Sequence, residues 1–191
     1  MSHSRSAALA ALIGLFTVLL PRAPLIAQQQ VFLSDGQALQ AALGDSERVR
    51  RVSLRLAPDR QAAIEKASGV RLQLGWMRCF QGVSHGKVFA YACIDNMIGK
   101  ERPITYILRI DHPEGRIGLL EVMEYREAIG AEVSAPPFVA QFHGKGLAGP
   151  LRLKQDIRNL SGATLSGRGL TDGARKILHL YHRYLKDLPP L

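Results

Sequence analysis

The sequence predicts an α+β fold, an antiparallel sheet with flanking helices, from three observations. Apolar and β-branched residues alternate through the middle of the chain, turn residues separate these stretches at short intervals, and helix signals lie at both ends. The 191 residues are 47% hydrophobic and 21% charged, which suits one compact domain behind a leader and argues against bulk disorder.

Residues 1–27 have the pattern of a signal peptide. Ala7–Leu20 is apolar and uncharged, and Ala27 offers a small residue for cleavage before Gln28. The apolar stretch is shorter than the ~20 residues that cross a bilayer. We favour cleavage, and the alternative is a marginal, uncleaved N-terminal anchor. Both place the following domain in the periplasm or another extracytoplasmic space, secreted by the leader.

Residues 28–69 are expected to form a helical N-terminal segment. Ser34, with Gln37 three residues later and an apolar run behind it, predicts a capped helix. Pro58–Ala67 predicts a second helix, which ends before Gly69.

Residues 70–191 are expected to form the main domain. Turn residues around Gly86 and at residues 111–115 lie between apolar stretches and predict two hairpins. The predicted strands are Arg71–Phe80, Lys87–Ile94, Ile104–Ile110 and Ile117–Tyr125. Ala135–Phe142 predicts a short helix, and the chain ends in an amphipathic one. Its apolar face recurs every three or four positions, at Leu170, Ala174, Ile177, Tyr181, Tyr184 and Leu188.

Cys79 and Cys93 are the only cysteines, too few for a disulfide scaffold or a zinc site. They lie on predicted strands at similar distances from the Gly86 turn, and one residue of register decides whether they share a face. A disulfide in an oxidising compartment and two buried thiols therefore both stay open.

The formal charge is +9, or +7 without residues 1–27, which hold two arginines and no acid. Such an excess is found in proteins that bind nucleic acids, anionic membranes or anionic ligands. The bases, however, alternate with apolar residues, and no RNA-recognition signature, zinc-finger spacing or basic run accompanies them. We therefore expect no nucleic-acid partner.

The segment from Asp156 to Ser166, where a loop meets the last helix, is the expected functional site. Its small residues allow a ligand to approach the backbone closely, and it is rich in hydroxyl groups. A helix N-terminus also presents unpaired N–H groups and a positive dipole end, which favour phosphate. Ordinary capping by serine or threonine explains the same pattern.

The string Asp156-x-x-x-x-Ser161-Gly162-Ala163-Thr164 resembles the flavin-attachment motif of the FMN-binding domain family. That family includes the flavin subunits of the Rnf complex and of sodium-pumping NADH:quinone oxidoreductase. Across roughly residues 70–180, further segments are similar to the family's small exported members. They are Lys87–Tyr91, Ile98–Tyr106, Leu120–Glu127, Phe138–Lys145 and Leu170–Arg175.

The resemblance implies FMN joined covalently to Thr164 by a phosphoester, which a Mg²⁺-dependent flavin transferase installs from FAD. It also implies that Asp156 organises the loop or helps the transferase recognise it. The residues expected to line the phosphate are Ser161, Gly162, Ala163, Leu165 and Ser166. FMN would exchange electrons with a membrane redox partner, so the protein is expected to be an electron carrier rather than an enzyme.

The chain departs from the family pattern in two places. Gly167-Arg168-Gly169 stands where Ser-Arg-Ala is expected, and each glycine costs a helix about 1 kcal/mol relative to alanine. The helix is therefore expected to begin nearer Leu170. Residues 124–133 only loosely parallel the Glu-Thr-Pro-Gly-Leu-Gly loop of the Rnf-type subunits, which leaves flavin-ring contacts there open.

Other residues give weaker patterns. His179 and His182 lack a nearby carboxylate or cysteine partner and are expected to be solvated, and Glu124 and Glu127 lack a predicted substrate pocket. Five aromatic residues are expected in the core or at its rim: Trp76, Tyr106, Tyr125, Tyr181 and Tyr184. Two other functions remain as alternatives: a flavin-free accessory module that docks to a membrane redox complex, and a small flavin-dependent reductase.

Overall fold

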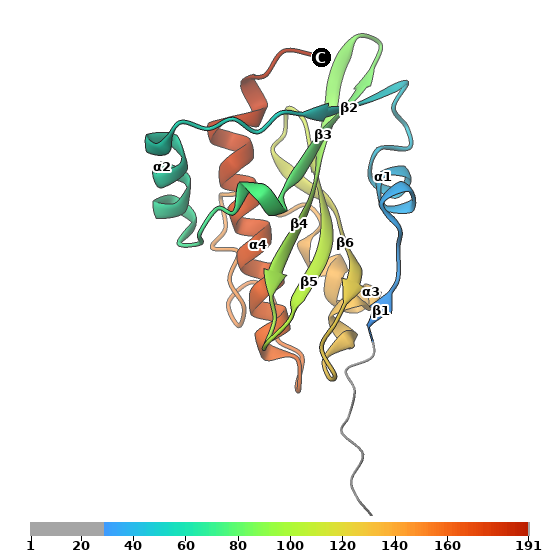
Figure 1. Ribbon diagram of the computed structural model, residues 1–191, viewed down its shortest axis with the longest axis vertical. Helices are drawn as coiled ribbons and strands as arrows, with labels where there is room; N and C mark the ends of the chain where they lie inside the picture. The colour runs from blue at the N-terminus through green and yellow to red at the C-terminus, as the bar shows by residue number, and fades with distance from the viewer. Residues whose placement is uncertain (1–28, 191) are drawn as a thin grey trace, which may run out of the picture.

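The computed structural model describes residues 29–190, so the expected signal peptide lies outside the described residues (Figure 1). An antiparallel six-stranded sheet lies at the centre, in the order β1-β6-β5-β4-β3-β2. The strands are β1 Gln30–Val31, β2 Arg48–Val52, β3 Arg78–Ser84, β4 Lys87–Ile98, β5 Pro103–Asp111 and β6 Arg116–Tyr125. The predicted α+β class is confirmed.

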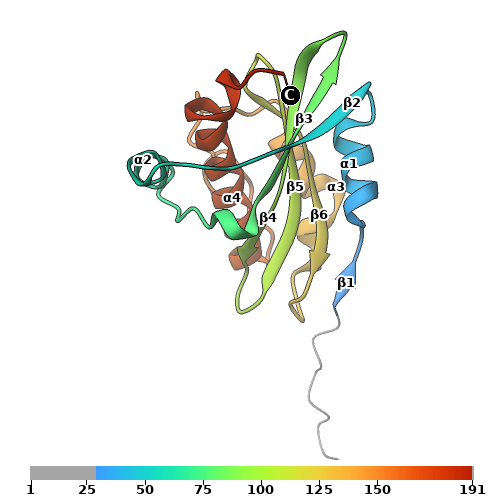
Figure 2. The same cartoon turned by 45° about the horizontal axis from the view of Figure 1, so that its top comes forward.

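Helices cover both faces of the sheet (Figures 1 and 2). The long helix α4, Thr164–Arg183, lies on one face, and α1, Asp35–Leu43, lies on the other. The helix α2, Pro58–Ser68, packs against α4, and α3, Pro136–Val139, packs near β6. Four short 3-10 turns complete the elements: η1 Leu74–Trp76, η2 Ala131–Ser134, η3 Ala140–Phe142 and η4 Leu185–Asp187.

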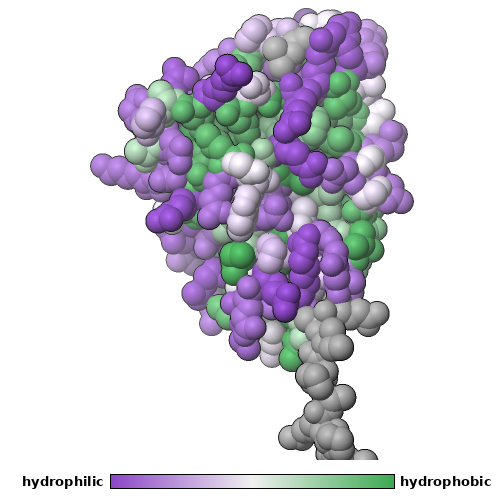
Figure 3. Space-filling view, viewed as in Figure 1, coloured by the Kyte–Doolittle hydropathy of each residue, from purple (hydrophilic) through white to green (hydrophobic). Residues whose placement is uncertain are grey.

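The sheet is buried on both sides, so two cores form. The larger core joins α4 to one face, and the smaller core joins Ala38, Ala42 and Leu43 of α1 to the other. Some hydrophobic residues also remain visible between α2 and β2 in the space-filling view (Figure 3). Leu54 and Leu74 line a shallow hollow beside β2 in this part of the molecule.

Local signals in the sequence explain most element ends. Ser34 and Gln37 form the predicted capping box at the start of α1. Pro58 is the first residue of α2, and Gly69, with φ 70°, ends it in the left-handed conformation. His85 and Gly86 both have positive φ and close the two-residue hairpin between β3 and β4.

The strand predictions need three corrections. Residues 71–77 are not a strand, because Leu74–Trp76 forms a 3-10 turn and β3 begins only at Arg78. The strand β4 continues beyond Ile94 to Ile98. The edge strands β1 and β2 were not predicted, because β1 is two residues long and β2 buries only Val52, so neither shows an apolar alternation.

The expected helix start near Leu170 is also wrong, since α4 begins at Thr164. Glycine allows this helix to lie against the sheet at a distance that no larger residue permits. A Cβ added to Gly169 would lie 2.8 Å from the carbonyl oxygen of Ile98, and one added to Gly173 would lie 2.3 Å from a hydroxyl on β5. The local cost of glycine is therefore offset by close packing.

Cys79 and Cys93 form a disulfide. The two residues lie directly opposite each other in the β3–β4 register, with their Cα atoms 4.1 Å apart, and both side chains face the larger core. Of the two states that the sequence left open, the pair of free thiols is wrong.

Candidate functional site

The residues of the motif lead directly into α4. Gly162 has φ 82°, which turns the chain, and Ala163 is the N-cap residue. Because alanine has no side-chain acceptor, it does not cap the first-turn N–H groups of a 20-residue helix. Capping by serine or threonine, the alternative explanation of the motif, is therefore not found at the N-cap position.

Thr164, the first residue of α4, is partly buried. Its Oγ1 accepts a hydrogen bond from Nδ2 of Asn159 at 2.9 Å. The other amide atom, Oδ1 of Asn159, is buried and has no hydrogen-bond partner. A buried polar atom without a partner is uncommon, because nearly all polar groups in protein interiors are hydrogen-bonded.

A pocket of about 650 Å³ opens beside this helix start. The start of α4 forms one side, the β4–β5 turn forms a second, and the loop after β6 forms a third. Its lining residues are Lys100, Glu101, Arg102, Glu127, Ala128, Ile129, Gly162, Ala163, Leu165 and Ser166. Four of the expected site residues therefore line one pocket, and Thr164 lies between two of them in the chain.

Glu127 holds two sides of the pocket together. Its Oε1 accepts the backbone N–H of Glu101 at 2.6 Å and that of Arg102 at 2.8 Å. Burial raises the pKa of the Glu127 carboxyl, but donation by the backbone of residues 100–102 and the charge of Lys100 outweigh burial, so the pKa lies below its usual value. The ionised carboxylate thus fixes the β4–β5 turn at the pocket.

Tyr125 joins the third side to α4. Its hydroxyl donates to the carbonyl oxygen of Ile129 at 2.6 Å, and the Ser166 hydroxyl lies 2.8 Å from the same oxygen. Because a phenol carries one proton, Ser166 must donate to Tyr125. Gly130, with φ 97°, completes the loop, where an added Cβ would lie 2.7 Å from the Tyr125 hydroxyl.

The other two expected site residues lie apart from the pocket lining. Ser161 is exposed. The carboxylate of Asp156 accepts the backbone N–H groups of Leu151 at 3.1 Å and Arg152 at 2.7 Å. Asp156 therefore holds the loop of residues 151–156 in place.

The structure also shows where the residues with weaker patterns lie. His179 and His182 are partly buried, which lowers the pKa of both, so they are less solvated than expected. Glu124 pairs with Arg126, away from Glu127 and the pocket lining. The core tyrosines Tyr106, Tyr125 and Tyr181 are buried, Tyr184 is partly buried and Trp76 is exposed at the rim.

Sequence reasoning missed Asn159 and did not assign a role to Glu127 or Lys100. Asn159 occupies an unspecified position of the motif, and its signal, an amide five residues before Thr164, is weak without the fold. Glu127 meets the backbone 25 and 26 residues earlier in the chain, a separation that no local pattern reveals.

Glu127→Gln is expected to lower Tm at pH 7, on the order of 2–4 °C if about 1 kcal/mol of hydrogen bonding is lost. Because the folded-state pKa of Glu127 lies below its unfolded value of about 4.5, its stabilisation is present above that value and is lost as the pH falls through the folded pKa. Melting curves of wild type and variant between pH 7 and pH 3 should therefore converge at the acid end. The substitution of an exposed residue, Glu132→Gln, serves as the control. A difference in Tm between wild type and Glu127→Gln that is as large at pH 3 as at pH 7 would contradict the prediction.

Within residues 29–190, no helix is both long and apolar enough to cross a membrane. In the same residues, no group of three or more His, Cys, Asp or Glu side chains is arranged to hold a metal ion. No protein-family profile matches the chain, and no curated protein is similar to it in sequence.

Proposed function

We propose that this protein is an exported electron-transfer flavoprotein of the FMN-binding domain type, with FMN carried covalently on Thr164. The observation that carries the proposal is the position of this residue. Thr164 begins a long helix without a side-chain cap, and its two neighbours line a pocket of about 650 Å³. The motif resemblance supplies the identity of the cofactor.

The surroundings of Thr164 suit a phosphoester. The unpaired N–H groups and dipole of the helix start favour a negatively charged phosphate. The Asn159 amide donates to Oγ1, and this geometry is compatible with esterification, because the oxygen accepts through a lone pair and not through its own proton. Attachment as the resemblance implies it would join Oγ1 to the FMN phosphate of FAD, with AMP as the leaving group and release of the hydroxyl proton.

The pocket suits the flavin ring in size and composition. Its volume lies within the range of small-molecule sites, about 300–1,000 Å³. Ile129 and Leu165 offer apolar contacts at its rim, where they are 71% and 45% exposed, and the two cations of the lining, Lys100 and Arg102, are balanced by Glu101 and Glu127. An open rim of this kind would leave an edge of a bound ring close to the surface, where a partner protein could exchange electrons with it.

The placement outside the cytoplasm has support from two parts of the chain. Ala7–Leu20 has the composition of a signal-peptide core. The disulfide between Cys79 and Cys93 is typical of oxidising compartments. A covalent cofactor is useful there, because it does not diffuse away from an exported protein.

When bound, FMN supplies one- and two-electron transfer, and the residues around Thr164 hold and orient it. The electron-carrier assignment is tested with protein co-expressed with a flavin transferase, reduced with dithionite and mixed with either a redox-active membrane fraction or small organic acceptors. The membrane fraction is expected to reoxidise the flavin much faster than the small organic acceptors do. Saturable turnover of one small acceptor, with product formation, would instead establish the flavin-dependent reductase. Protein without flavin that still binds the membrane complex would establish the accessory module.

A further inference from the structure

A second hollow, of about 420 Å³, lies where the C-terminal end of α2, the loop 151–156 and the first half of α4 meet. We call it the basic hollow. It is lined mainly by Gly69, Arg152, Lys154, Arg168, Asp172 and Arg175. None of these residues lines the pocket beside Thr164.

The one acidic residue of the basic hollow is already paired. Asp172 accepts from Nη2 of Arg175 at 2.8 Å. Arg175 is itself only 7% exposed, and its other donors reach the carbonyl oxygens of Ser68 at 2.8 Å and Leu151 at 3.0 Å. Arg175 is therefore a fixed cation whose charge Asp172 balances, and its hydrogen bonds join α2 and the loop 151–156 to α4.

Three cations remain without a counter-charge. The side chains of Arg152, Lys154 and Arg168 are exposed, and among the described residues none of them has a hydrogen-bond or ion-pair partner. Like charges gathered at one hollow repel each other, an arrangement that an anionic ligand would relieve.

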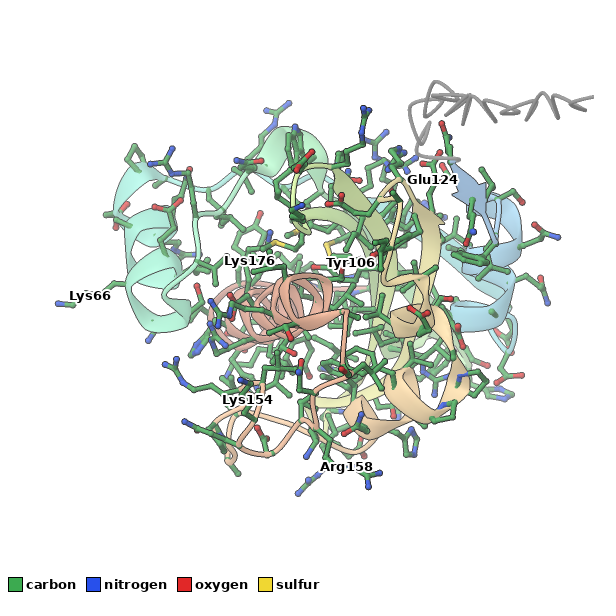
Figure 4. The ribbon with its side chains drawn as sticks, turned by 90° about the horizontal axis from the view of Figure 1, so that it is seen from below. Lys66, Tyr106, Glu124, Lys154, Arg158 and Lys176 are labelled. Carbon is green, nitrogen blue, oxygen red and sulfur yellow. A yellow bond between two sulfur atoms is a disulfide. The ribbon has the colours of Figure 1, made fainter. Side chains whose placement is uncertain are left out.

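The loop that carries two of these cations is held in place. The carboxylate of Asp156 accepts two backbone N–H groups of the loop, and the N–H of Lys154 donates to the carbonyl oxygen of Ile157 at 2.7 Å. Lys154 lies on this loop below α4 in Figure 4, whereas Lys66 projects into solvent from α2. A cation on a fixed loop loses less freedom on binding than one on a mobile segment.

The segment that contributes Gly69 to the basic hollow is also rich in cations. Residues 48–78, which include α2, hold eight of the 25 Lys and Arg residues of the chain and only two of its 16 acidic residues. A net positive charge of this kind favours the approach of anions to the protein as a whole, and the three cations of the hollow supply the local binding.

We propose that the basic hollow binds a ligand with two or more linked phosphate groups. Guanidinium groups such as those of Arg152 and Arg168 bind phosphate through paired hydrogen bonds, and Lys154 adds a point charge. A concave site of 420 Å³ suits a compact polyanion, whereas a macromolecule needs an extended face. The ligand is either an inorganic diphosphate or the diphosphate of a nucleotide, and both present the same chemistry to the three cations.

The test uses the full chain expressed without a flavin transferase, so its outcome is independent of flavin attachment. Pyrophosphate, ADP and orthophosphate are titrated by calorimetry at low ionic strength. We expect saturable binding of pyrophosphate at one site per chain. Its affinity is expected to exceed that of orthophosphate by about tenfold or more. Equal affinities for ADP and pyrophosphate would identify the phosphates as the whole recognition element, and tighter ADP binding would identify a nucleotide ligand.

The variant Arg152→Gln/Lys154→Asn/Arg168→Gln removes the three cations. Asparagine is chosen at position 154 because Lys154 has φ 66°, a conformation that asparagine tolerates. Binding of pyrophosphate is expected to weaken about tenfold or more. The control, Arg55→Gln/Arg60→Gln/Lys66→Gln, changes the net charge equally and is expected to bind within about twofold of wild type.

Three outcomes would overturn the proposal. One is the absence of saturable pyrophosphate binding. Another is an equal loss of affinity in both triple variants, which would indicate only general attraction to a basic protein. The third is that polyglutamate or anionic vesicles bind more tightly than pyrophosphate and that the triple variant of the basic hollow abolishes this binding. That result would identify a surface for a macromolecule. If the triple variant does not fold, Lys154→Asn alone is expected to weaken binding severalfold, and unchanged affinity would refute the site.

Discussion

Thr164→Val is expected to abolish covalent flavin on protein co-expressed with an active flavin transferase. Valine has nearly the shape of threonine but no oxygen to form the phosphoester, so the chain should fold and remain unmodified. Thr164→Ser is expected to keep part of the flavin, since the hydroxyl is present. The measurement is the mass of the tryptic peptide of residues 159–168, which in wild type should increase by FMN less one water.

The control is Ser161→Ala, which removes a nearby, exposed hydroxyl of the motif. Modification of its peptide is expected to become less efficient only if the transferase recognises Ser161, and any flavin present should still map to Thr164. A full FMN increment in Thr164→Val would move the attachment to another hydroxyl, such as Ser166. An unmodified wild-type peptide under the same conditions would exclude covalent flavin altogether.

Lys176→Met is expected to destabilise the protein by about 3–5 kcal/mol, the usual cost of leaving a buried charge without its partner. The Lys176 ammonium lies 2.7 Å from Oδ2 of Asp95, and the two side chains are 2% and 0% exposed. The Tyr106 hydroxyl donates to the same oxygen at 3.0 Å. Burial, with the neighbouring Asp95 charge, raises the pKa of Tyr106 well above its usual value, so this hydroxyl remains a donor. Lys176 and Tyr106 lie in the interior between α4 and the sheet (Figure 4).

The free energy of unfolding is measured with urea. The double variant Asp95→Asn/Lys176→Met should recover much of the loss, because an amide needs no counter-charge and still accepts from Tyr106. The exposed Lys66→Met should stay within about 0.5 kcal/mol of wild type. If Lys176→Met lowers the free energy of unfolding no more than Lys66→Met does, the ion pair contributes little to stability. If the double variant does not regain stability, the decrease is due to lost packing.

Much of the fold follows from local patterns. The hairpin of β5 and β6 is visible as two apolar stretches around the turn at residues 111–115, and the structure pairs these strands. The capping box of Ser34 and the helix end at Gly69 are likewise determined by side chains within a few residues. In each case the stabilising contact is short-range in the chain, so the sequence contains the whole signal.

Local patterns do not predict, or misplace, the elements that depend on distant partners. The strand β2 is rich in arginine and becomes a strand by pairing with β3, about 30 residues later in the chain. The sequence predicts the start of α4 too late in the chain, because helix propensity includes the cost of glycine at Gly169 but not the close approach of this residue to the carbonyl of Ile98. The disulfide likewise depended on the register that places Cys79 opposite Cys93.

The candidate site divides in the same way. The sequence by itself determined the small residues and hydroxyls at the start of α4, because one contiguous segment carries them, from Gly162 to Ser166. Only the tertiary structure decided that Glu127 and Tyr125 join this segment to the β4–β5 turn and the loop after β6. The pocket is lined by segments that are far apart in the chain. These segments meet only because the sheet places the ends of distant strands beside one helix, and local propensities carry no information about that arrangement.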